Sequence, residues 1–447
     1  MSPTISPQQD HPALNQELHK EPQQEQHQCC GGPATGLLPL AQGQQQILQA
    51  IEPLQQRMQL DLRNAQGRIL AQEVISSINV PAYNNSAMDG YAVASADINR
   101  AGETRLQVIA SVLAGHPYHG TLQPGQCVKI MTGSKMPDQL DTVIIKEVCH
   151  CEDLDSDTAP HPYVRFPAGA KAGQNRRLAG EDLARGAVAI PAGTRLGAAE
   201  LGMIASLGQA EVCVYRKPRV AYFSTGDEIR SLGQTLEAGQ IYDSNRYTVT
   251  AMLRSLDIEV IDLGVIPDRP EAIEAALLQA STQADVVLSS GGVSLGEADF
   301  VTEALEKLGQ VGFWRLAIKP GRPLAFGKVG EALFFGLPGN PVAVMVSFLQ
   351  LVKPALRKLG GEAHWLPLSG QLPCAEALRK KPGRTEFIRG IIETDANGLP
   401  QVRSSGHQGS GILTSMSQAN CLIVLSEDQG DIATGDLVQV QPFAGLL

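Results

Sequence analysis

Along the 447 residues, the spacing of apolar side chains changes from one segment to the next. Residues 1–36 are rich in Gln, Pro and His and contain few apolar residues, so they cannot bury enough surface to offset their ordering entropy. We expect them to form a disordered tail. Residues 37–62 carry an approximate helical stripe, which predicts an N-terminal helix. Short β-like runs separated by Gly and Pro then predict β modules, at 69–75, 106–113, 126–131, 142–148, 163–166 and 187–190, before a helix at 198–207.

From residue 217 onward, apolar strand-like runs alternate with helical segments. This alternation predicts a mostly parallel sheet covered by helices on both faces. Ligands of such sheets bind where the carboxyl ends of strands meet the amino ends of helices. From about residue 362 the short β runs return and predict a separate C-terminal domain. The strands are expected at 220–224, 259–265, 285–290, 324–328 and 332–337, and the helices at 247–255, 270–280, 299–308 and 341–359.

Composition narrows the possible functions. Aromatic residues make up only 4% of the chain, which argues against a reader of single-stranded nucleic acid, because such proteins stack bases on aromatic side chains. The formal net charge of -10 provides no general attraction to DNA or to an anionic membrane, and the apolar stretch 342–352 is too short to span a bilayer. The N-terminus lacks a signal-peptide pattern and the eight cysteines form no CxxC pair, so we expect a cytoplasmic protein with reduced thiols.

Two Cys/His segments, residues 27–30 and 149–151, could bind a soft metal. The first belongs to the expected tail. In the second, alternate residues of a strand point to opposite faces, which is poor chelating geometry. We therefore expect neither segment to be a metal site.

Loops of the α/β region could bind an anion. Ser290, Gly291, Gly292 and Ser294 follow a buried strand, and a helix is expected to begin near Asp299. Glycines allow close backbone approach and a helix amino end adds partial positive charge, which suits a phosphate or a pterin. Asp299 either caps this helix or binds a metal. The glycine spacing matches neither the Walker loop nor the dinucleotide fingerprint.

Two further turns would extend this site. The first consists of Pro338, Gly339, Asn340 and Pro341. It either is a rigid connection, with Pro341 at the first helical position, or forms a second anion cradle at the same sheet edge. The second consists of Lys319, Pro320, Gly321, Arg322 and Pro323 and adds two cations. Together the three loops would make a basic, amide-rich rim on an acidic protein.

Carboxylates accompany these loops. Asp227 and Glu228 directly follow a strand, where they would repel an anionic substrate unless Mg²⁺ lay between them. A turn with acids at a helix start is the alternative. In the β-rich part, Asp89 lies in a crowded small-residue segment that could also be an ordinary Asp-Gly turn. Thr132 and Asp182 add a hydroxyl and an acid, but spacing alone does not bring them to the sheet edge.

In this order, the segments resemble the molybdopterin molybdenumtransferase family, to which the C-terminal domain of gephyrin also belongs. The resemblance covers roughly residues 37–447. It departs from the family pattern at 81–84, and 149–162 looks like a local insertion; neither touches a presumed catalytic position. The motifs that carry the resemblance are residues 85–92, 177–182, 224–228, 242–245, 291–299, 319–323 and 337–341.

The resemblance implies an elongated homodimer in which a central, mostly parallel three-layer α/β domain is accompanied by β-rich domains. It implies Mg²⁺-dependent insertion of molybdate into adenylylated molybdopterin with release of AMP. Molybdopterin adenylyltransferase and cofactor-accepting proteins are possible partners. The expected parts are a tail (1–36), a helix on the α/β domain (37–62), a linking domain (63–84 with 187–214), a β-rich domain (85–186), the α/β domain (215–361) and a C-terminal β-domain (362–447).

Residue roles are also implied by the resemblance. Glu228 and Asp299 would bind the metal, and Arg315 and Lys319 would line the anion site with the turn at 338–341. The β-rich domain of one subunit would face the α/β domain of the other and bring Asp89 and Asp182 to its cleft. The residues expected to matter for activity are Asp89, Thr132, Asp182, Glu228, Asp268 and Asp299.

Three rivals stay open. A non-catalytic scaffold of the same fold would be free to lose its acidic residues, which are all present. A molybdopterin adenylyltransferase would be far shorter. A nucleotide hydrolase would act without molybdate.

Overall fold

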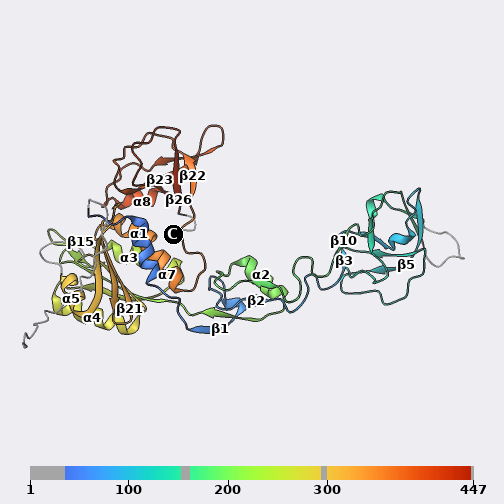
Figure 1. Ribbon diagram of the computed structural model, residues 1–447, viewed down its shortest axis with the longest axis horizontal. Helices are drawn as coiled ribbons and strands as arrows, with labels where there is room; N and C mark the ends of the chain where they lie inside the picture. The colour runs from blue at the N-terminus through green and yellow to red at the C-terminus, as the bar shows by residue number, and fades with distance from the viewer. Residues whose placement is uncertain (1–35, 153–161, 293–299, 444–447) are drawn as a thin grey trace, which may run out of the picture.

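A computed structural model describes residues 36–152, 162–292 and 300–443. The chain is elongated (Figure 1). An α/β unit lies at one end, beneath a C-terminal β-unit, and a β-rich unit lies at the other end, joined by a slender linking unit. The predicted tail, Ser294 and Asp299 fall outside the described residues, apart from Gly36. In the described ranges, no helix is long and apolar enough to cross a membrane.

The α/β unit is built on a six-stranded sheet with the order β16-β13-β17-β21-β20-β18. The first four strands are parallel, so the prediction of a mostly parallel sheet is confirmed. The last two are antiparallel to their neighbours, and β18 was not predicted, because two glycines interrupt its apolar pattern. The strands are β16 (Glu259–Ile266), β13 (Arg219–Thr225), β17 (Val286–Ser290), β21 (Ala332–Leu337), β20 (Pro323–Val329) and β18 (Gly309–Arg315).

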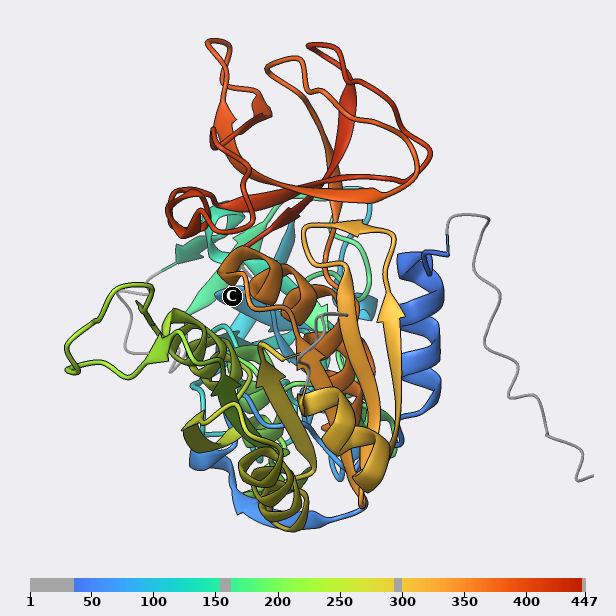
Figure 2. The ribbon, with the colours of Figure 1, turned by 90° about the vertical axis from the view of Figure 1, so that its left-hand side faces the viewer.

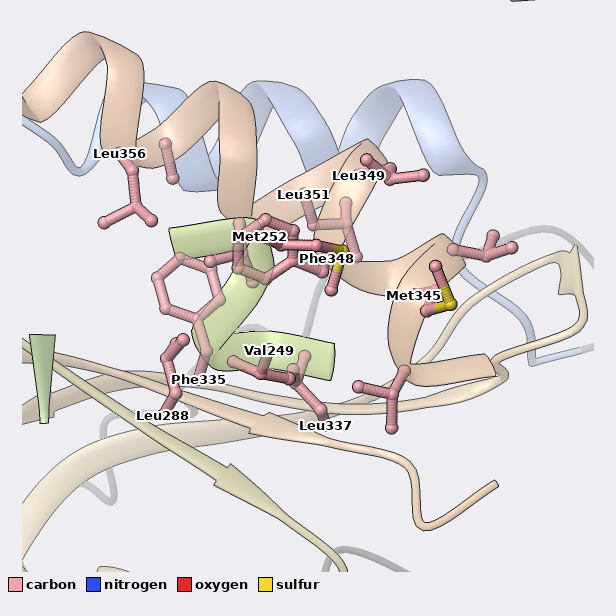
Figure 3. Close-up of a cluster of buried hydrophobic side chains, with 14 of the residues drawn as sticks. Val249, Met252, Leu288, Phe335, Leu337, Met345, Phe348, Leu349, Leu351 and Leu356 are labelled. Atoms are coloured by element: carbon pink, nitrogen blue, oxygen red, sulfur yellow. The ribbon is translucent and has the colours of Figure 1, made fainter. Parts of the chain in front are cut away.

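Helices cover both faces of this sheet because successive side chains of each strand point to opposite sides. On β17, Leu288 packs beneath α1, α3 and the α6–α7 segment with Phe335 and Phe348, as Figure 3 shows. Val287 packs on the opposite face with the helices α4 and α5. The helices are α1 (Leu40–Gln49), α3 (Ser244–Ser255), α4 (Pro270–Gln283), α5 (Phe300–Leu308), α6 (Pro341–Ser347), a π-helical turn (Phe348–Val352) and α7 (Lys353–Leu359).

The predicted helix over residues 37–62 is wrong in its second half. Helix α1 ends at Gln49, and residues Arg57–Asp61 form strand β1, which pairs antiparallel with β12 (Glu211–Tyr215). Pro53 explains the break, because proline lacks an amide hydrogen and disfavours helical geometry at the preceding residue. The α1 segment packs on the α/β unit, where Ile47 and Ile51 are buried.

The linking unit contains β1 and β12, helix α2 (Ala198–Ser206), and strand β2 (Val74–Ile75) paired with β11 (Val188–Ile190). Its small core includes Leu70, Leu196, Ile204 and Val214. Two pieces of chain, before and after the β-rich unit, make up this unit, so the β-rich unit is inserted into it.

The β-rich unit has a six-stranded sheet with the order β7-β4-β6-β5-β9-β8 and two hydrophobic cores. The predicted run 142–148 was too long, because residues 146–148 form a 3₁₀ helix. Cys151 lies exposed on β8 and contacts the Tyr91 hydroxyl at 2.7 Å. The strands are β7 (Thr142–Ile145), β4 (Gly90–Val93), β6 (Gln126–Ile130), β5 (Thr104–Val112), β9 (Tyr163–Phe166) and β8 (His150–Glu152), beside the pair β3 (Asn85–Ser86) and β10 (Arg176–Arg177).

The C-terminal β-unit stands above the α/β unit (Figure 2). Its sheet begins with β19 (Ile318–Lys319), which comes from the α/β segment of the chain and pairs with β23. The turn after Lys319 is therefore held by both units. The other elements are β23 (Thr385–Thr394), β25 (Cys421–Leu425), β26 (Leu437–Pro442), β22 (Gly370–Pro373), β24 (Pro400–Ser404) and α8 (Leu413–Gln418).

Candidate functional site

Strand direction gathers distant segments at one edge of the α/β sheet. The parallel strands β13, β16, β17 and β21 end at this edge and lead into residues 226–228, 267–268, 291–292 and 338–340. Strand β20 is antiparallel to β21, so its first residue, Pro323, and the turn before it lie at the same edge. Segments that are up to about a hundred residues apart in the sequence thus come together, as expected for α/β sheets.

Apart from residues 226–227 and 267–268, these segments line a recess of about 1280 Å³ that is open to solvent, here called the strand-end cleft. A second recess of about 1190 Å³ adjoins it and shares Glu228, Gly291, Gly339 and Asn340. The cleft also includes Gly292, Lys319, Pro320, Gly321, Arg322, Pro323 and Pro338, and the adjoining recess adds Ser224, Thr225, Tyr242, Asp243, Asn245, Ser290 and Pro341.

Glycines allow the backbone to bend sharply around the cleft. Gly291 has φ 87°, and a Cβ there would lie 2.5 Å from the carbonyl oxygen of Thr225. Gly321 has φ 102°, and a Cβ would lie 2.7 Å from the Ser347 hydroxyl. L-residues rarely adopt such angles, and here a side chain would also clash. Any larger residue would therefore shift the loops that line the cleft.

Two further carboxylates, Asp227 and Asp268, lie near Glu228 beside the cleft. The Asp268 Oδ1 accepts a hydrogen bond of 3.2 Å from the Thr225 hydroxyl. Burial raises the pKa of Asp268, and the neighbouring carboxylates of Asp227 and Glu228 raise it further, against the lowering effect of that hydrogen bond. The local excess of negative charge, carried by hard oxygen donors, fits a divalent cation such as Mg²⁺.

No group of three or more His, Cys, Asp or Glu side chains within the described ranges is arranged as a complete metal site. The second predicted metal ligand, Asp299, lies outside those ranges. Glu228 is the predicted ligand that the structure does place, and it lines both recesses.

Three cations face the carboxylates across the cleft. The Lys319 Nζ lies 3.0 Å from the Glu386 carboxylate, and half of the Lys319 side chain stays exposed. Within the described part of the chain, the side chains of Arg322 and Arg384 form no hydrogen bond or ion pair. These two guanidinium groups are therefore available to an anionic ligand.

Arg384, Gln408 and Ser410 were missed by sequence reasoning, although they form the C-terminal side of the cleft. One signal was present: the tetrapeptide Lys-Pro-Gly-Arg occurs twice, at residues 319–322 and 381–384. Both copies contribute an arginine to the same cleft. Because β19 pairs with β23, the two turns are brought side by side.

Buried polar side chains fix the cleft walls. The Tyr222 hydroxyl contacts the hydroxyls of Ser290 at 2.6 Å and Ser224 at 2.9 Å, which ties the end of β13 to that of β17. The buried Arg389 donates to the Gly409 carbonyl at 3.1 Å, and its own backbone amide donates to Gln408 at 2.9 Å. The loop 408–410 is thereby held at the cleft.

The predicted residues of the β-rich unit form a separate cluster. The Asp89 Oδ1 accepts hydrogen bonds of 2.9 Å from both the backbone amide and the hydroxyl of Thr132, and its Oδ2 lies 3.3 Å from Lys146. These contacts, the Thr132 amide first, hold the pKa of Asp89 below its ordinary value. Asp182 lies in another segment, where its amide donates to the Val80 carbonyl at 3.1 Å.

Within one chain, this cluster lies at the opposite end of the molecule from the strand-end cleft (Figure 1). The structure therefore does not bring Asp89, Thr132 and Asp182 to Glu228 and Asp268 in a single subunit. Arg315 closes strand β18, and among the described residues it lines neither the cleft nor the adjoining recess.

Comparison with protein families matches almost the whole described chain. The model "MoeA N-terminal region (domain I and II)" matches residues 38–208, "Probable molybdopterin binding domain" matches 221–358, and "MoeA C-terminal region (domain IV)" matches 371–443. The molybdopterin molybdenumtransferase of Haemophilus influenzae is 42% identical over 92% of this chain and 100% of its own length. The chain belongs to the molybdopterin molybdenumtransferase family. This confirms the resemblance found from the sequence, and with it a transferase of molybdenum cofactor biosynthesis.

Other members of the molybdopterin molybdenumtransferase family and its relatives agree. The Nostoc enzyme of the same name is 38% identical over 85% of this chain and 87% of its own. Gephyrin of Dictyostelium discoideum is 31% identical over 91% of this chain and 62% of its own. The solved structure of the molybdopterin biosynthesis MoeA protein of Pyrococcus horikoshii superposes with a TM-score of 0.77 at 27% identity, covering 91% of this chain and 100% of that one.

Proposed function

We propose that this chain inserts molybdate into adenylylated molybdopterin and releases AMP. The supporting observation is the composition of the strand-end cleft, which combines the Glu228 carboxylate, glycine loops and three cations at the ligand-binding edge of an α/β sheet. An adenylylated pterin phosphate has two phosphates to neutralise, and molybdate is a tetrahedral dianion. Guanidinium, ammonium and backbone amide groups suit both.

Cleavage of a phosphoanhydride depends more on neutralised charge and correct positioning than on a strong nucleophile. Arg322, Arg384 and Lys319 would hold the anionic oxygens, and the loops at 291–292 and 338–340 would position them. Glu228 would contribute to Mg²⁺ binding, and the ion when bound neutralises developing charge on the phosphates. Asp268, which accepts a hydrogen bond from Thr225 close to Glu228, would orient or exchange a proton.

The active assembly would be a homodimer in which the β-rich unit of one copy meets the strand-end cleft of the other. The separation of the Asp89 cluster from the cleft of its own chain supports this arrangement. Asp89 and Glu228 could form one site only if they came from two different copies. The Asp89 carboxylate is held by Thr132 and Lys146 yet stays accessible. It would then act on substrate in the partner's cleft.

The reaction is tested by measuring AMP release from adenylylated molybdopterin, with and without molybdate and Mg²⁺. We expect release that requires both, together with a cofactor that reconstitutes a molybdoenzyme. Lys319→Gln should slow release, whereas Lys328→Gln, an exposed change on β20 outside the cleft, should not. Release without molybdate would indicate a hydrolase, and no release from folded protein would indicate a scaffold.

The dimeric site is tested by mixing two inactive variants, Asp89→Asn and Glu228→Gln. Random pairing of two symmetric clefts would restore about one quarter of wild-type activity, because half the dimers are mixed and one of their two clefts is intact. No recovery, with subunit exchange confirmed by native mass spectrometry, would contradict a shared cleft and leave the reaction itself untouched.

A further inference from the structure

A small recess that is open to solvent lies between the linking unit and the α/β unit, here called the hinge recess. The linking unit contributes Arg68 and Arg195, and the α/β unit contributes Lys217, Asp257 and Arg357. Residues 216–218 precede β13, and residues 256–258 precede β16. The hinge recess therefore lies at the amino ends of the parallel strands, away from the strand-end cleft at their carboxyl ends.

Positive charge exceeds negative charge around the hinge recess. Five cationic side chains line it, against a single lining carboxylate, that of Asp257. Arg68 is only 8% exposed. The lining cations are Arg68, Arg195, Arg216, Lys217 and Arg357.

The cations have to share their carboxylate partners. Arg195 and Arg357 both contact Glu362, at 2.9 and 2.5 Å. Arg68 and Lys217 both contact Asp257, and Arg216 forms an ion pair with Asp285 at 2.6 Å. Three carboxylates thus serve five lining cations, so the network keeps a positive surplus in a partly buried place, where uncompensated charge is costly.

A buried lysine lies on α7, close to Arg357 in the sequence. Lys353 is 6% exposed, on the first turn of that helix. Burial lowers its pKa to about 8, and the positive charges of Arg357 and Arg195 add to that lowering, against the opposite effect of Glu362. The charged side chains that line the recess are positive in sum, although the chain as a whole carries -10. A concave, electropositive site concentrates anions.

We propose that the hinge recess binds a tetrahedral oxyanion of the phosphate class and thereby stiffens the joint between the linking and α/β units. Guanidinium groups from both units would contact the anion, which suits the planar, bidentate way in which arginine binds such oxygens. Inorganic phosphate and molybdate share this shape and charge. The site is separate from the strand-end cleft and does not depend on the function proposed for the cleft.

Hydrogen exchange of the full chain tests this proposal in phosphate, in molybdate and in chloride at equal ionic strength. We expect phosphate to slow hydrogen exchange in peptides that cover residues 65–70, 215–218 and 254–260. If molybdate gives the same protection at a lower concentration, molybdate is the preferred occupant. Equal protection in chloride would overturn the proposal. All measurements are repeated on Lys319→Gln, so that anion binding in the cleft is separated from binding at the hinge.

The hinge variant is Lys217→Glu, whose side chain is 42% exposed and whose replacement should leave the fold intact. We expect at least about tenfold weaker anion protection, the scale of one lost charge contact. The matched control is Arg219→Glu, which should retain protection. Arg219 is exposed, lies two residues after Lys217 at the start of β13, pairs with Glu259 and does not line the recess. Undiminished protection in Lys217→Glu would overturn the assignment to this recess.

Discussion

The strand-end cleft and the hinge recess lie at opposite ends of the same parallel strands, and both are lined by more cations than carboxylates. Beside the cleft, burial raises the pKa of Asp268, and the neighbouring carboxylates raise it further. At the hinge, burial lowers the pKa of Lys353 to about 8, and the charges of Arg357 and Arg195 lower it further. Arg322 and Arg384 in the cleft have no partner among the described residues, whereas the hinge cations share carboxylates. The unpaired cations and the carboxylates of the cleft suit a metal and its anionic substrate, and the hinge network mainly joins two units.

The largest functional effect should come from Glu228→Gln, which removes one negative charge from the cleft. We expect molybdenum insertion to fall by about a hundredfold, the scale of losing one preorganised electrostatic contact. Single-turnover AMP release with Mg²⁺ varied would measure it. The matched control is Glu306→Gln, an exposed position on α5 that lines neither the cleft nor the adjoining recess. An unchanged rate in Glu228→Gln would remove Glu228 from the site.

At the hinge, Glu362→Gln should enlarge the positive surplus and destabilise the fold. The Glu362 side chain is only 6% exposed and joins Arg195 to Arg357, so we expect a loss of about 2–3 kcal/mol in the free energy of unfolding at neutral pH. Denaturant titration would measure it. A loss below the error of the titration would show that the network adds nothing to stability.

The pH dependence of that loss gives an independent check. The arginines hold the pKa of Glu362 below its ordinary value of about 4.3 despite burial, so its stabilisation is present above that value and disappears as the pH falls through the lowered pKa. The difference in the free energy of unfolding between wild type and Glu362→Gln should therefore become smaller below about pH 4. A gap that stays constant down to the acid transition would contradict this account.

A smaller effect is expected from Arg384→Gln, because it removes one of several cations from the cleft. We expect KM for the adenylylated substrate to rise about tenfold with less change in kcat, as for a contact made equally in the ground and transition states. Arg384→Lys should recover part of the affinity. A fall in kcat alone would instead place Arg384 at the reacting atoms.

The smallest effect should follow Lys146→Met, since this ion pair with Asp89 is exposed and lies outside both recesses. The Thr132 hydrogen bonds remain, so the pKa of Asp89 should rise only slightly. The acid limb of the pH–rate profile would then move slightly toward higher pH, because Asp89 loses its charge earlier as the pH falls. A large displacement would show that Lys146, rather than Thr132, controls Asp89.

Sequence reasoning succeeded where side chains have the period of the element that they form. The buried strand predicted at 285–290 forms as Val286–Ser290, and 163–166 forms a strand with those bounds. It failed at residues 57–61, where an apparent helical stripe belongs to a strand that needs a distant partner, Glu211–Tyr215. Pairing between remote segments leaves no local periodic signal, so such a strand is hard to detect from the sequence.

The same distinction applies to the sites. The local pattern of side chains predicts the parallel α/β core and the loops at its strand ends, because strand direction dictates where those loops meet. It does not predict that Arg384 and Ser410 line the strand-end cleft, or that Arg68, Arg195 and Arg357 converge on one recess. Nor does it predict that the β-rich unit, with Asp89, lies at the other end of the molecule. A local excess of charge depends on which charged side chains lie close together in space. Residues that are far apart along the chain come close together only when separate units pack against each other.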